Sequence, residues 1–481
     1  MSFATIEFFL FLAATFSLYY LHRGKSWQNT VLLVASYIFY AAWDYRFCSL
    51  MLLSSLIDYG AGWGILRTSH PGRRKVLLMV GLGANLALLG FFKYYDFFVD
   101  SLSQFLSAVG WEANLATLNI ILPVGISFYT FQTMSYTIDI YRGQLQPQGG
   151  LVQYLTFVSF FPQLVAGPIE RATHLLPQFN AGRVFSAAAG TEGVRLILYG
   201  LFCKMVLADH LGGIVERVYS HPNQAAPGEL AVATIAFGFQ IYFDFAAYST
   251  IATGTARLFG IQLMRNFDYP YFSRTIREFW RRWHVSLSTW FRDYVYIPLG
   301  GSRQSLEITC RNLFLTFLLS GLWHGAAEHF VMWGVFHGVY ITLAYWAEAG
   351  PLHRLMSRMR WDGPWLEPVR ILRTFFLVMA AWVLFRASSV AEAATIYQRV
   401  GTGVFTAEFY PQVIGLVTAE WPVFLALAGT VALEWVHRDR GNPLPLPPRS
   451  RLARWLVYTG IFWLILLFGT QRTAEFIYFQ F

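Results

Sequence analysis

Charge is scarce in this sequence. Only 13% of its 481 residues are Asp, Glu, Lys or Arg, about half the share of an ordinary soluble domain, whereas 56% are hydrophobic and 18% aromatic. So little charge excludes a conventional water-exposed surface and indicates that an apolar solvent surrounds most of the chain. The composition therefore predicts an integral membrane protein.

Cysteine is scarcer still, since Cys48, Cys203 and Cys310 are the whole set. Three scattered thiols cannot form a disulfide framework or the paired ligands of a zinc site, so we expect no metal site. The sequence also lacks internal repeats and any shift in composition that would mark a soluble domain. We therefore expect a single membrane domain over residues 1–481.

The formal net charge of +9 could indicate nucleic-acid binding. In a membrane chain, however, excess Lys and Arg more often mark loops that face the cytoplasm and its anionic lipid. We therefore expect membrane lipid as a partner and no nucleic acid. Placing the basic residues 22–25 and 67–75 in the cytoplasm puts the N-terminus outside. The basic, Pro-rich stretch 437–454 is then another cytoplasmic loop, and one further crossing puts the C-terminus outside.

Apolar stretches recur along the chain, and each crossing of the hydrocarbon core takes about 20 residues as helix. They leave room for about ten crossings, so the predicted fold is an all-α polytopic membrane protein. Several stretches are only about 10 to 14 residues long, which favours re-entrant and interfacial helices around a central funnel or tunnel. The stretches span residues 6–21, 30–43, 47–66, 76–92, 119–138, 194–211, 230–255, 313–322, 330–347, 371–385, 423–436 and 456–469.

Arginine and aromatic residues are interleaved over residues 274–303. Both kinds of side chain keep an apolar body in lipid and a polar tip in water, so one interpretation is a helix lying in the membrane interface. Pro298, Gly300 and Gly301 cannot continue that helix. The broken backbone has to be sheltered by protein or water, as it is where it lines a cavity.

His324 lies in an apolar stretch, where an ionisable side chain usually faces a cavity or a partner. The small residues after it would leave room for a ligand. On a continuous helix Glu328 would share its face and orient the ring, whereas His337 would point about 220° away. From these residues alone, a catalytic and a structural histidine are equally supported. Asp244 lies in another apolar run, where it requires an arginine partner or a cavity.

Several segments of the chain closely resemble membrane-bound O-acyltransferases (MBOAT) of the alginate O-acetyltransferase type. The resemblance covers nearly the whole chain and is highly specific. The segments are residues 279–294 (FWRRWHVSLSTWFRDY), 297–301 (IPLGG), 323–325 (WHG), 333–338 (WGVFHG), 122–132 (LPVGISFYTFQ) and 161–169 (FPQLVAGPI). The family pattern is not followed at residues 242–250 (YFDFAAYST), where a Ser-Gly pair and a later Asp are usual.

The resemblance implies an MBOAT-like helical assembly in which His324 is the catalytic histidine and His284 supports it. It also makes the last six residues, 476–481, look like the Phe-x-Tyr-x-x-Phe motif of relatives or of their small partner proteins. Tyr478 would then carry the acyl group, although an aromatic belt residue at the outer interface fits the same position. Six further residues are candidates for lining or supporting the site: Trp323, Asp244, Arg282, Trp283, Glu328 and His337.

The implied activity is acetyl transfer from a cytoplasmic donor, acetyl-CoA, to an extracytoplasmic acceptor, for O-acetylation of an exopolysaccharide such as alginate. No tightly bound cofactor is expected. A periplasmic or membrane-anchored acetyltransferase would complete the modification, and the location would be the bacterial inner membrane. Two alternatives are D-alanyl transfer to a cell-wall polymer and, in another class, a secondary transporter with broken helices and midplane charges.

Overall fold

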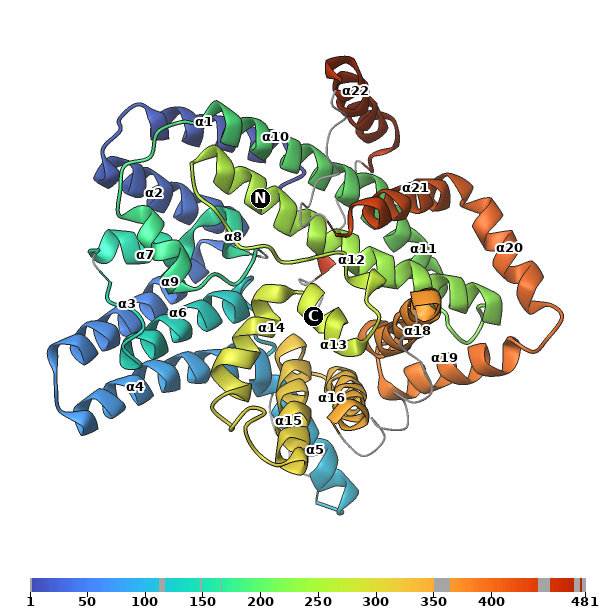
Figure 1. The fold of residues 1–481 in the computed structure, drawn as a ribbon. Coiled ribbons are helices and arrows are strands. Elements are labelled where there is room, and N and C mark those ends of the chain that lie inside the picture. The colour runs from blue at the N-terminus through green and yellow to red at the C-terminus, as the bar shows by residue number, and fades with distance from the viewer. Residues whose placement is uncertain are drawn as a thin grey trace. The chain divides into compact units, whose positions relative to one another are not determined.

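The computed structural model describes residues 2–111, 117–147, 149–165, 167–349, 364–439, 450–470 and 476–477. All regular secondary structure in these ranges is helical (Figure 1), which confirms the all-α prediction. The chain forms two compact units, Met1–Ile197 with Ile251–Met264 (unit 1) and Leu198–Thr250 with Arg265–Phe481 (unit 2). The expectation of one membrane domain over residues 1–481 stays a prediction.

Unit 1 contains the first helices of the chain, and α10 and α12 are shared between the units. The unit 1 helices are α1 (Ile6–Tyr20), α2 (Lys25–Asp44), α3 (Arg46–Arg67), α4 (Pro71–Leu89), a π-turn (Gly90–Tyr94), α5 (Tyr95–Ala108), α6 (Ile126–Tyr141), α7 (Leu151–Ser159), α8 (Phe161–Leu164), α9 (Ala172–Leu175) and a 3-10 turn (Leu176–Phe179). The shared helices are α10 (Ala187–Phe202) and α12 (Pro227–Leu258).

Unit 2 contains short helices in its middle and longer ones after them. They are a π-turn (Cys203–Ala208), α11 (Asp209–Tyr219), a 3-10 turn (Pro270–Phe272), α13 (Ile276–Arg282), α14 (Val285–Phe291), a second π-turn (Arg292–Tyr296), α15 (Leu306–His324), α16 (Glu328–Ala349), a 3-10 turn (Pro364–Leu366), α18 (Glu367–Arg386), α19 (Val390–Gly403), α20 (Phe409–Ala419), α21 (Trp421–His437) and α22 (Arg451–Phe468).

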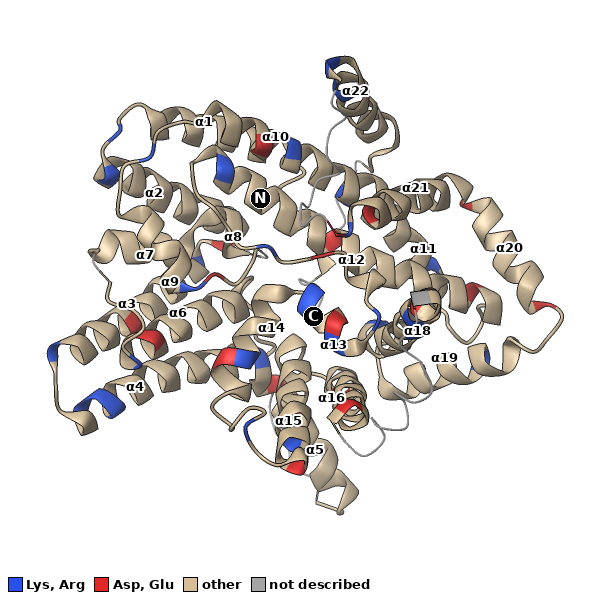
Figure 2. Ribbon diagram, in the orientation of Figure 1, with Lys and Arg blue, Asp and Glu red and all other residues tan. Residues whose placement is uncertain are grey.

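The long helices carry few charges along their length, and Lys, Arg, Asp and Glu gather mainly near helix ends and in loops (Figure 2). Seven helices in the described residues are long and apolar enough to cross a membrane, or eight if the bent pair α20 and α21 counts as one span. The chain is therefore a multi-pass membrane protein. No apolar residue of α22 is buried, as expected where lipid covers a helix.

Within the described residues, the seven or eight spans are fewer than the about ten that the sequence suggested. The stretch 119–138 begins as irregular backbone, and its helix α6 is almost wholly covered by protein. The stretch 313–322 lies in α15, which carries Glu307, Arg311 and Asn312 and is not apolar enough to count as a span. The stretch 76–92 does count as a span, and it is part of one continuous helix, Pro71–Ala108.

Two of the segments that carry the family resemblance pack against each other within unit 1. Gly125 begins α6 with φ 76°, and a Cβ at this residue would lie 2.9 Å from the Leu164 carbonyl oxygen. The side-chain amides of Gln132 and Gln163 both donate to the Phe157 carbonyl, at 2.6 and 3.1 Å. These motifs therefore hold the unit together by close backbone approach and by satisfying a buried carbonyl.

Helices α15 and α16 lie side by side in unit 2 (Figure 1). Gly321 of α15 faces Gly334 of α16, and a Cβ on Gly321 would lie 2.8 Å from the Gly334 Cα. Side chains at these positions would force the two helices apart, so the glycines permit their close packing. This pairing sets the position of His324, the last residue of α15.

Candidate functional site

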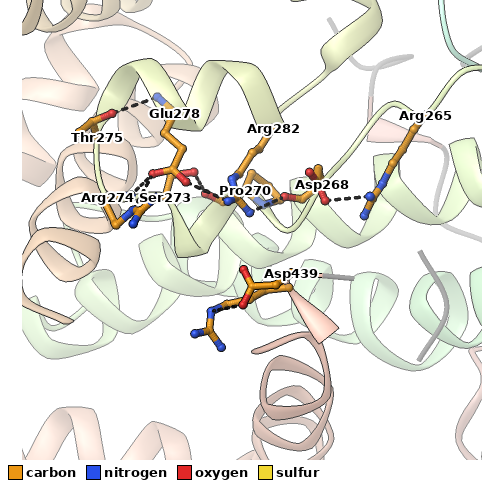
Figure 3. A network of polar contacts seen from close by, with 10 residues as sticks. Arg265, Asp268, Pro270, Ser273, Arg274, Thr275, Glu278, Arg282 and Asp439 are labelled. Atoms are coloured by element: carbon orange, nitrogen blue, oxygen red, sulfur yellow. Dashed lines mark hydrogen bonds and ion pairs between the residues drawn. The ribbon is translucent and has the colours of Figure 1, made fainter. Parts of the chain in front are cut away.

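The helix that leads to His284 begins with Thr275 as its N-cap. The Thr275 hydroxyl accepts a hydrogen bond from the Glu278 amide at 3.1 Å, and the Glu278 carboxylate accepts from the Arg274 amide at 2.8 Å (Figure 3). Burial raises the pKa of Glu278, but the Arg274 amide and the charges of Arg282 and Arg274 outweigh it and leave the pKa below its usual value. The ionised carboxylate thus fixes the first turn of α13.

Arg282, one of the expected supporting residues, is held by the same carboxylate. Its Nη2 lies 2.8 Å from Glu278 Oε1, and its Nη1 donates to the Asp268 carbonyl at 3.4 Å (Figure 3). The guanidinium therefore ties α13 to the loop before it. The neighbouring Arg277 and Arg281, rather than Arg282, line the cavity described below.

His284 lies at the break between α13 and α14 and is fully buried. Its backbone is left-handed, with φ 41° and ψ 55°, a conformation that is uncommon for a residue with a Cβ and that clusters at functional sites. Its Nδ1 lies 3.0 Å from Asn266 Oδ1. Because an amide oxygen only accepts, this contact favours the ring form with its proton on Nδ1 and leaves Nε2 as the basic nitrogen.

Burial also sets the charge of His284, which lies outside the spanning helices. Removal from water disfavours the imidazolium and lowers the pKa of His284 to about 3. The ring is therefore neutral at pH 7. A neutral ring of fixed tautomer can accept a proton or a hydrogen bond at Nε2 without prior deprotonation.

Asn266, which the sequence analysis missed, organises this break. Its Oδ1 also accepts from the Ser286 hydroxyl at 2.9 Å, and its backbone carbonyl accepts from the Val285 amide at 2.8 Å. Its side-chain NH₂ donates to Ser249 Oγ at 3.0 Å. A single asparagine in a loop has no distinctive spacing, so only its contacts reveal that it orients His284.

His324 lies in an aromatic environment and is 4% exposed. Its ring contacts Trp323, Trp333 and Phe385, with centroid distances of 5.0, 4.9 and 5.3 Å. The ring of His284 approaches Trp323 as well, at 6.3 Å. The structure therefore brings the two predicted histidines to the same indole, although they are forty residues apart in the sequence.

The expectation that Glu328 shares a helix face with His324 is wrong, because the helix does not continue. Gly325 is extended, with φ −158° and ψ 150°, and Glu328 begins α16 as an exposed residue. The expected room beside Gly325 is also absent, since the Phe330 ring occupies the space where a side chain would lie. The ring of His324 is packed by aromatic side chains instead.

The expected separation of His337 from His324 is wrong for the same reason. Both rings contact Trp333, and His337 does so at 4.7 Å. The Trp280 indole donates from Nε1 to His337 Nδ1 at 3.3 Å. Because α16 runs back along α15, His337 joins the His324 surroundings through Trp333. Trp283, another expected residue, contacts Trp382 of α18 at 5.0 Å.

A cavity of about 500 Å³ lies between α13, α14, α15 and α16. Its wall includes the guanidinium-bearing residues Arg277, Arg281 and Arg292 together with Trp280, whose indole contacts both His337 and Trp333. Ser320, one turn before His324 on α15, also lines it. The cavity thus lies behind the aromatic residues that surround His324 and has the size of a small-molecule site.

The predicted helix break at residues 297–301 is confirmed. Gly300 and Gly301 have φ 112° and 57°, and the Asn312 side chain donates to the Leu299 and Gly301 carbonyls at 3.0 and 3.4 Å. Asn312 thus satisfies two carbonyls of the broken backbone, whereas residues 297–299 themselves are exposed. Ser302, directly after it, lines the cavity.

Asp244 is buried and paired, but its partner is a lysine rather than the expected arginine. Lys204 Nζ lies 2.7 Å from Asp244 Oδ1. Tyr478 lies outside the described residues, whereas Phe476 and Ile477 before it are described and buried. Among the described residues, no group of three or more His, Cys, Asp or Glu side chains is arranged to hold a metal ion.

These features define a polytopic membrane protein with two buried histidines at helix ends, beside a cavity with basic side chains. Residues 147–347 match the MBOAT, membrane-bound O-acyltransferase family. The chain belongs to this family and is an O-acyltransferase, which confirms the resemblance drawn from its motifs. The transporter alternative is thereby set aside.

Three relatives with different printed names show how far the similarity extends. "Probable alginate O-acetylase AlgI" of Pseudomonas putida is 37% identical over 99% of this chain and 99% of its own length. "Peptidoglycan O-acetyltransferase" of Helicobacter pylori is 34% identical over 76% of this chain and 72% of its length. "Teichoic acid D-alanyltransferase" of Bacillus subtilis is 29% identical over 56% of this chain and 69% of its length. The similarity to the alginate O-acetylase therefore runs along the whole chain.

Proposed function

We propose that this protein transfers an acetyl group from cytoplasmic acetyl-CoA to a hydroxyl acceptor on the other side of the membrane, for O-acetylation of an exopolysaccharide such as alginate. The observation that carries the proposal is the meeting of His324 and His284 at the Trp323 indole. Full-length similarity to a protein named as an alginate O-acetylase supports acetyl as the group and alginate as the acceptor polymer.

The chemistry assigned to His324 is general-base catalysis. The imidazole takes the proton of the acceptor hydroxyl while the oxygen attacks the thioester carbonyl carbon. A C–O bond forms, the C–S bond breaks, and the proton passes to the departing thiolate, giving an acetate ester and the free thiol of CoA. Such assistance accounts for about 10² to 10⁴ in rate. His284, held by Asn266, serves as the neutral supporting group that orients the reactants or steadies the developing oxyanion.

The cavity behind Trp280 is our candidate for the donor site. Guanidinium groups bind phosphate oxygens in paired hydrogen bonds, and Arg277, Arg281 and Arg292 line this cavity. Its apolar remainder suits a pantetheine arm, and Ser320 lies one helical turn from His324. Excess arginine also favours the cytoplasmic side, where acetyl-CoA is made available.

Tyr478 is proposed as the acyl carrier between His324 and the final acceptor. The acetyl ester formed on its hydroxyl would pass to a periplasmic or membrane-anchored acetyltransferase, which modifies the polymer. In this arrangement the chain lies in the bacterial inner membrane with both termini outside. The basic loops at 67–75 and 437–454 support that orientation. Trp323, Trp283 and His337 shape the site, and the membrane part acts as one domain around a funnel.

Purified protein in detergent with [¹⁴C]acetyl-CoA tests the proposal. Wild type should release CoA and acquire label, and His324→Ala should lose both by at least about 10²-fold. His329→Gln is the matched control, because His329 is also a buried histidine of this region and its Nδ1 contacts the Leu384 carbonyl at 3.0 Å. Full activity in His324→Ala would contradict the proposal. If the protein acquired label only when a labelled D-alanyl carrier protein replaced acetyl-CoA as donor, the reaction would be D-alanyl transfer instead.

Tyr478→Phe tests the carrier separately, because the ring stays and only the hydroxyl is lost. The variant should still bind donor but should not retain label on the chain. Peptide mass spectrometry of the C-terminal fragment locates the acetyl group. Retention of normal labelling in Tyr478→Phe would remove Tyr478 from the mechanism while leaving the role of His324 untouched.

A further inference from the structure

A buried lysine lies between two buried carboxylates in unit 2. Lys204 Nζ lies 2.9 Å from Asp209 Oδ1 and 2.7 Å from Asp244 Oδ1, and all three side chains are at most 10% exposed. Lys204 lies in the π-turn Cys203–Ala208, a type of helix irregularity often found at functional sites. Two carboxylates on one ammonium leave the cluster with oxygen atoms free to accept further hydrogen bonds.

The C-terminal segment of the chain supplies those hydrogen bonds at two points. The Thr470 hydroxyl donates to Asp209 Oδ2 at 3.2 Å, and the Ile477 amide donates to Asp244 Oδ2 at 2.8 Å. The Thr470 amide also donates to the Met205 carbonyl at 3.4 Å. The two carboxylates that pair with Lys204 therefore attach the segment at Thr470, just after α22, and again at Ile477.

Aromatic contacts connect Phe476 of this segment with His284. The Phe476 ring lies 4.8 Å from Tyr248 and 5.7 Å from Phe245. Phe245 is in turn in edge contact with His284 at 4.6 Å. One phenylalanine side chain thus separates the first residue of the terminal hexapeptide from the supporting histidine.

We propose that Lys204, Asp209 and Asp244 form a positioning site for the chain's own C-terminal segment, which they hold at Thr470 and Ile477. The inference rests on the proposed function, because Tyr478 directly follows the anchored Ile477. Buried charges are costly unless each is paired, and the hydrogen bonds from Thr470 and Ile477 complete the pairing of the two carboxylates. Lys204, Asp209 and Asp244 position the acceptor and do not touch the reacting atoms.

Hydrogen–deuterium exchange of the full chain in detergent tests the positioning site without any acyl donor. Lys204→Met should speed exchange in the C-terminal peptide about tenfold, because a detached segment exposes its amides. Lys75→Met removes an exposed lysine and should leave that exchange unchanged. Equal exchange in the two variants would overturn the proposal.

A second pair of variants avoids any loss of a buried charge. Thr470→Val removes only the hydroxyl that donates to Asp209, and we expect about threefold faster exchange of the same peptide. Thr418→Val is its control, because that hydroxyl donates only to Ile414 and Gly415 of its own helix. Unchanged exchange in Thr470→Val would contradict anchoring at Thr470, even if Lys204→Met failed to fold.

Acetyl labelling separates this inference from the proposed function. Lys204→Met should lower labelling of the C-terminal peptide about ten- to a hundredfold, and Lys204→Arg should restore part of it because the positive charge returns. Faster exchange without any wild-type labelling would uphold the positioning site and refute the carrier role. Normal labelling in a Lys204→Met protein with detached C-terminal residues would overturn the positioning role.

Discussion

His324 and His337 lie on different helices and contact the same indole, that of Trp333, at centroid distances of 4.9 and 4.7 Å. The extended backbone of Gly325 ends α15 directly after His324, and α16 returns alongside it. Two residues that lie thirteen positions apart in the sequence thereby contact the same side chain. The two rings have different surroundings. His337 accepts a hydrogen bond from the Trp280 indole, whereas His324 is the last residue of α15.

His337→Phe should destabilise the protein more than it impairs the chemistry. A phenyl ring replaces the imidazole, so the Trp280 indole loses its acceptor in a buried site, which costs about 1–3 kcal/mol. We expect a lower melting temperature in detergent and a loss of acetyl transfer of less than about tenfold, well short of the loss in His324→Ala. Activity abolished at an unchanged melting temperature would instead make His337 a catalytic residue.

Asn266→Ala should lower acetyl transfer about ten- to a hundredfold, because a supporting histidine that loses its orienting partner is misplaced. Ser286→Ala removes only one of the donors to Asn266 Oδ1 and should have a smaller effect. Initial rates at saturating acetyl-CoA, measured for both variants, check the order. A larger loss in Ser286→Ala would show that the serine, and not the asparagine, orients the ring.

The sequence predicted the class of protein because low charge and long apolar stretches are what a membrane solvent requires of a chain. The roles of His324 and His284 came from the family resemblance and remain predictions, since the residues alone supported a structural histidine equally well. The helix break at 297–301 was predictable, since Pro298 and two glycines cannot continue a helix. Its partner Asn312 was not, because its contact with Leu299 depends on the folded path.

Predictions that assumed a continuous helix failed. Whether α15 continues through Gly325 is decided by tertiary packing of Phe330 and of the Gly321 and Gly334 pair, not by local preference. Once the helix ends, Glu328 leaves the His324 face and His337 approaches it. Lys204 was missed as well, because a single lysine inside the apolar stretch 194–211 has no distinctive spacing, and only the fold places Asp209 and Asp244 beside it.

Stability should fall in acid, in part through His284. Its folded-state pKa of about 3 lies below the unfolded value near 6.5, so between these values the unfolded state binds more protons. The contribution of His284 is therefore constant above about pH 6.5 and is lost as pH falls, by about 1.4 kcal/mol for each pH unit. Melting temperatures from pH 7.5 to 4.5 should drop less steeply in His284→Gln than in wild type. Parallel curves would show that the ring is not held neutral.

Gly321→Ala tests whether close packing of α15 and α16 positions His324. A methyl group there would meet the Phe330 carbonyl oxygen and lie 2.8 Å from the Gly334 Cα, both of them backbone atoms that cannot rotate away. Overpacking of this kind costs about 1–3 kcal/mol and shifts the backbone. We expect a lower melting temperature and a loss of acetyl transfer of at least about tenfold, because His324 ends the displaced helix.

Gly429→Ala provides the control for that change, because nothing lies within 4 Å of the added methyl group on α21. Alanine is also the better helix former, by about 0.5–1 kcal/mol, so this variant should be at least as stable as wild type. If Gly321→Ala matched it in both melting temperature and rate, the glycine pair would not control the helix separation. His324 would then be positioned by its aromatic neighbours alone, and Trp333→Ala would become the decisive variant, since Trp333 contacts both His324 and Phe385.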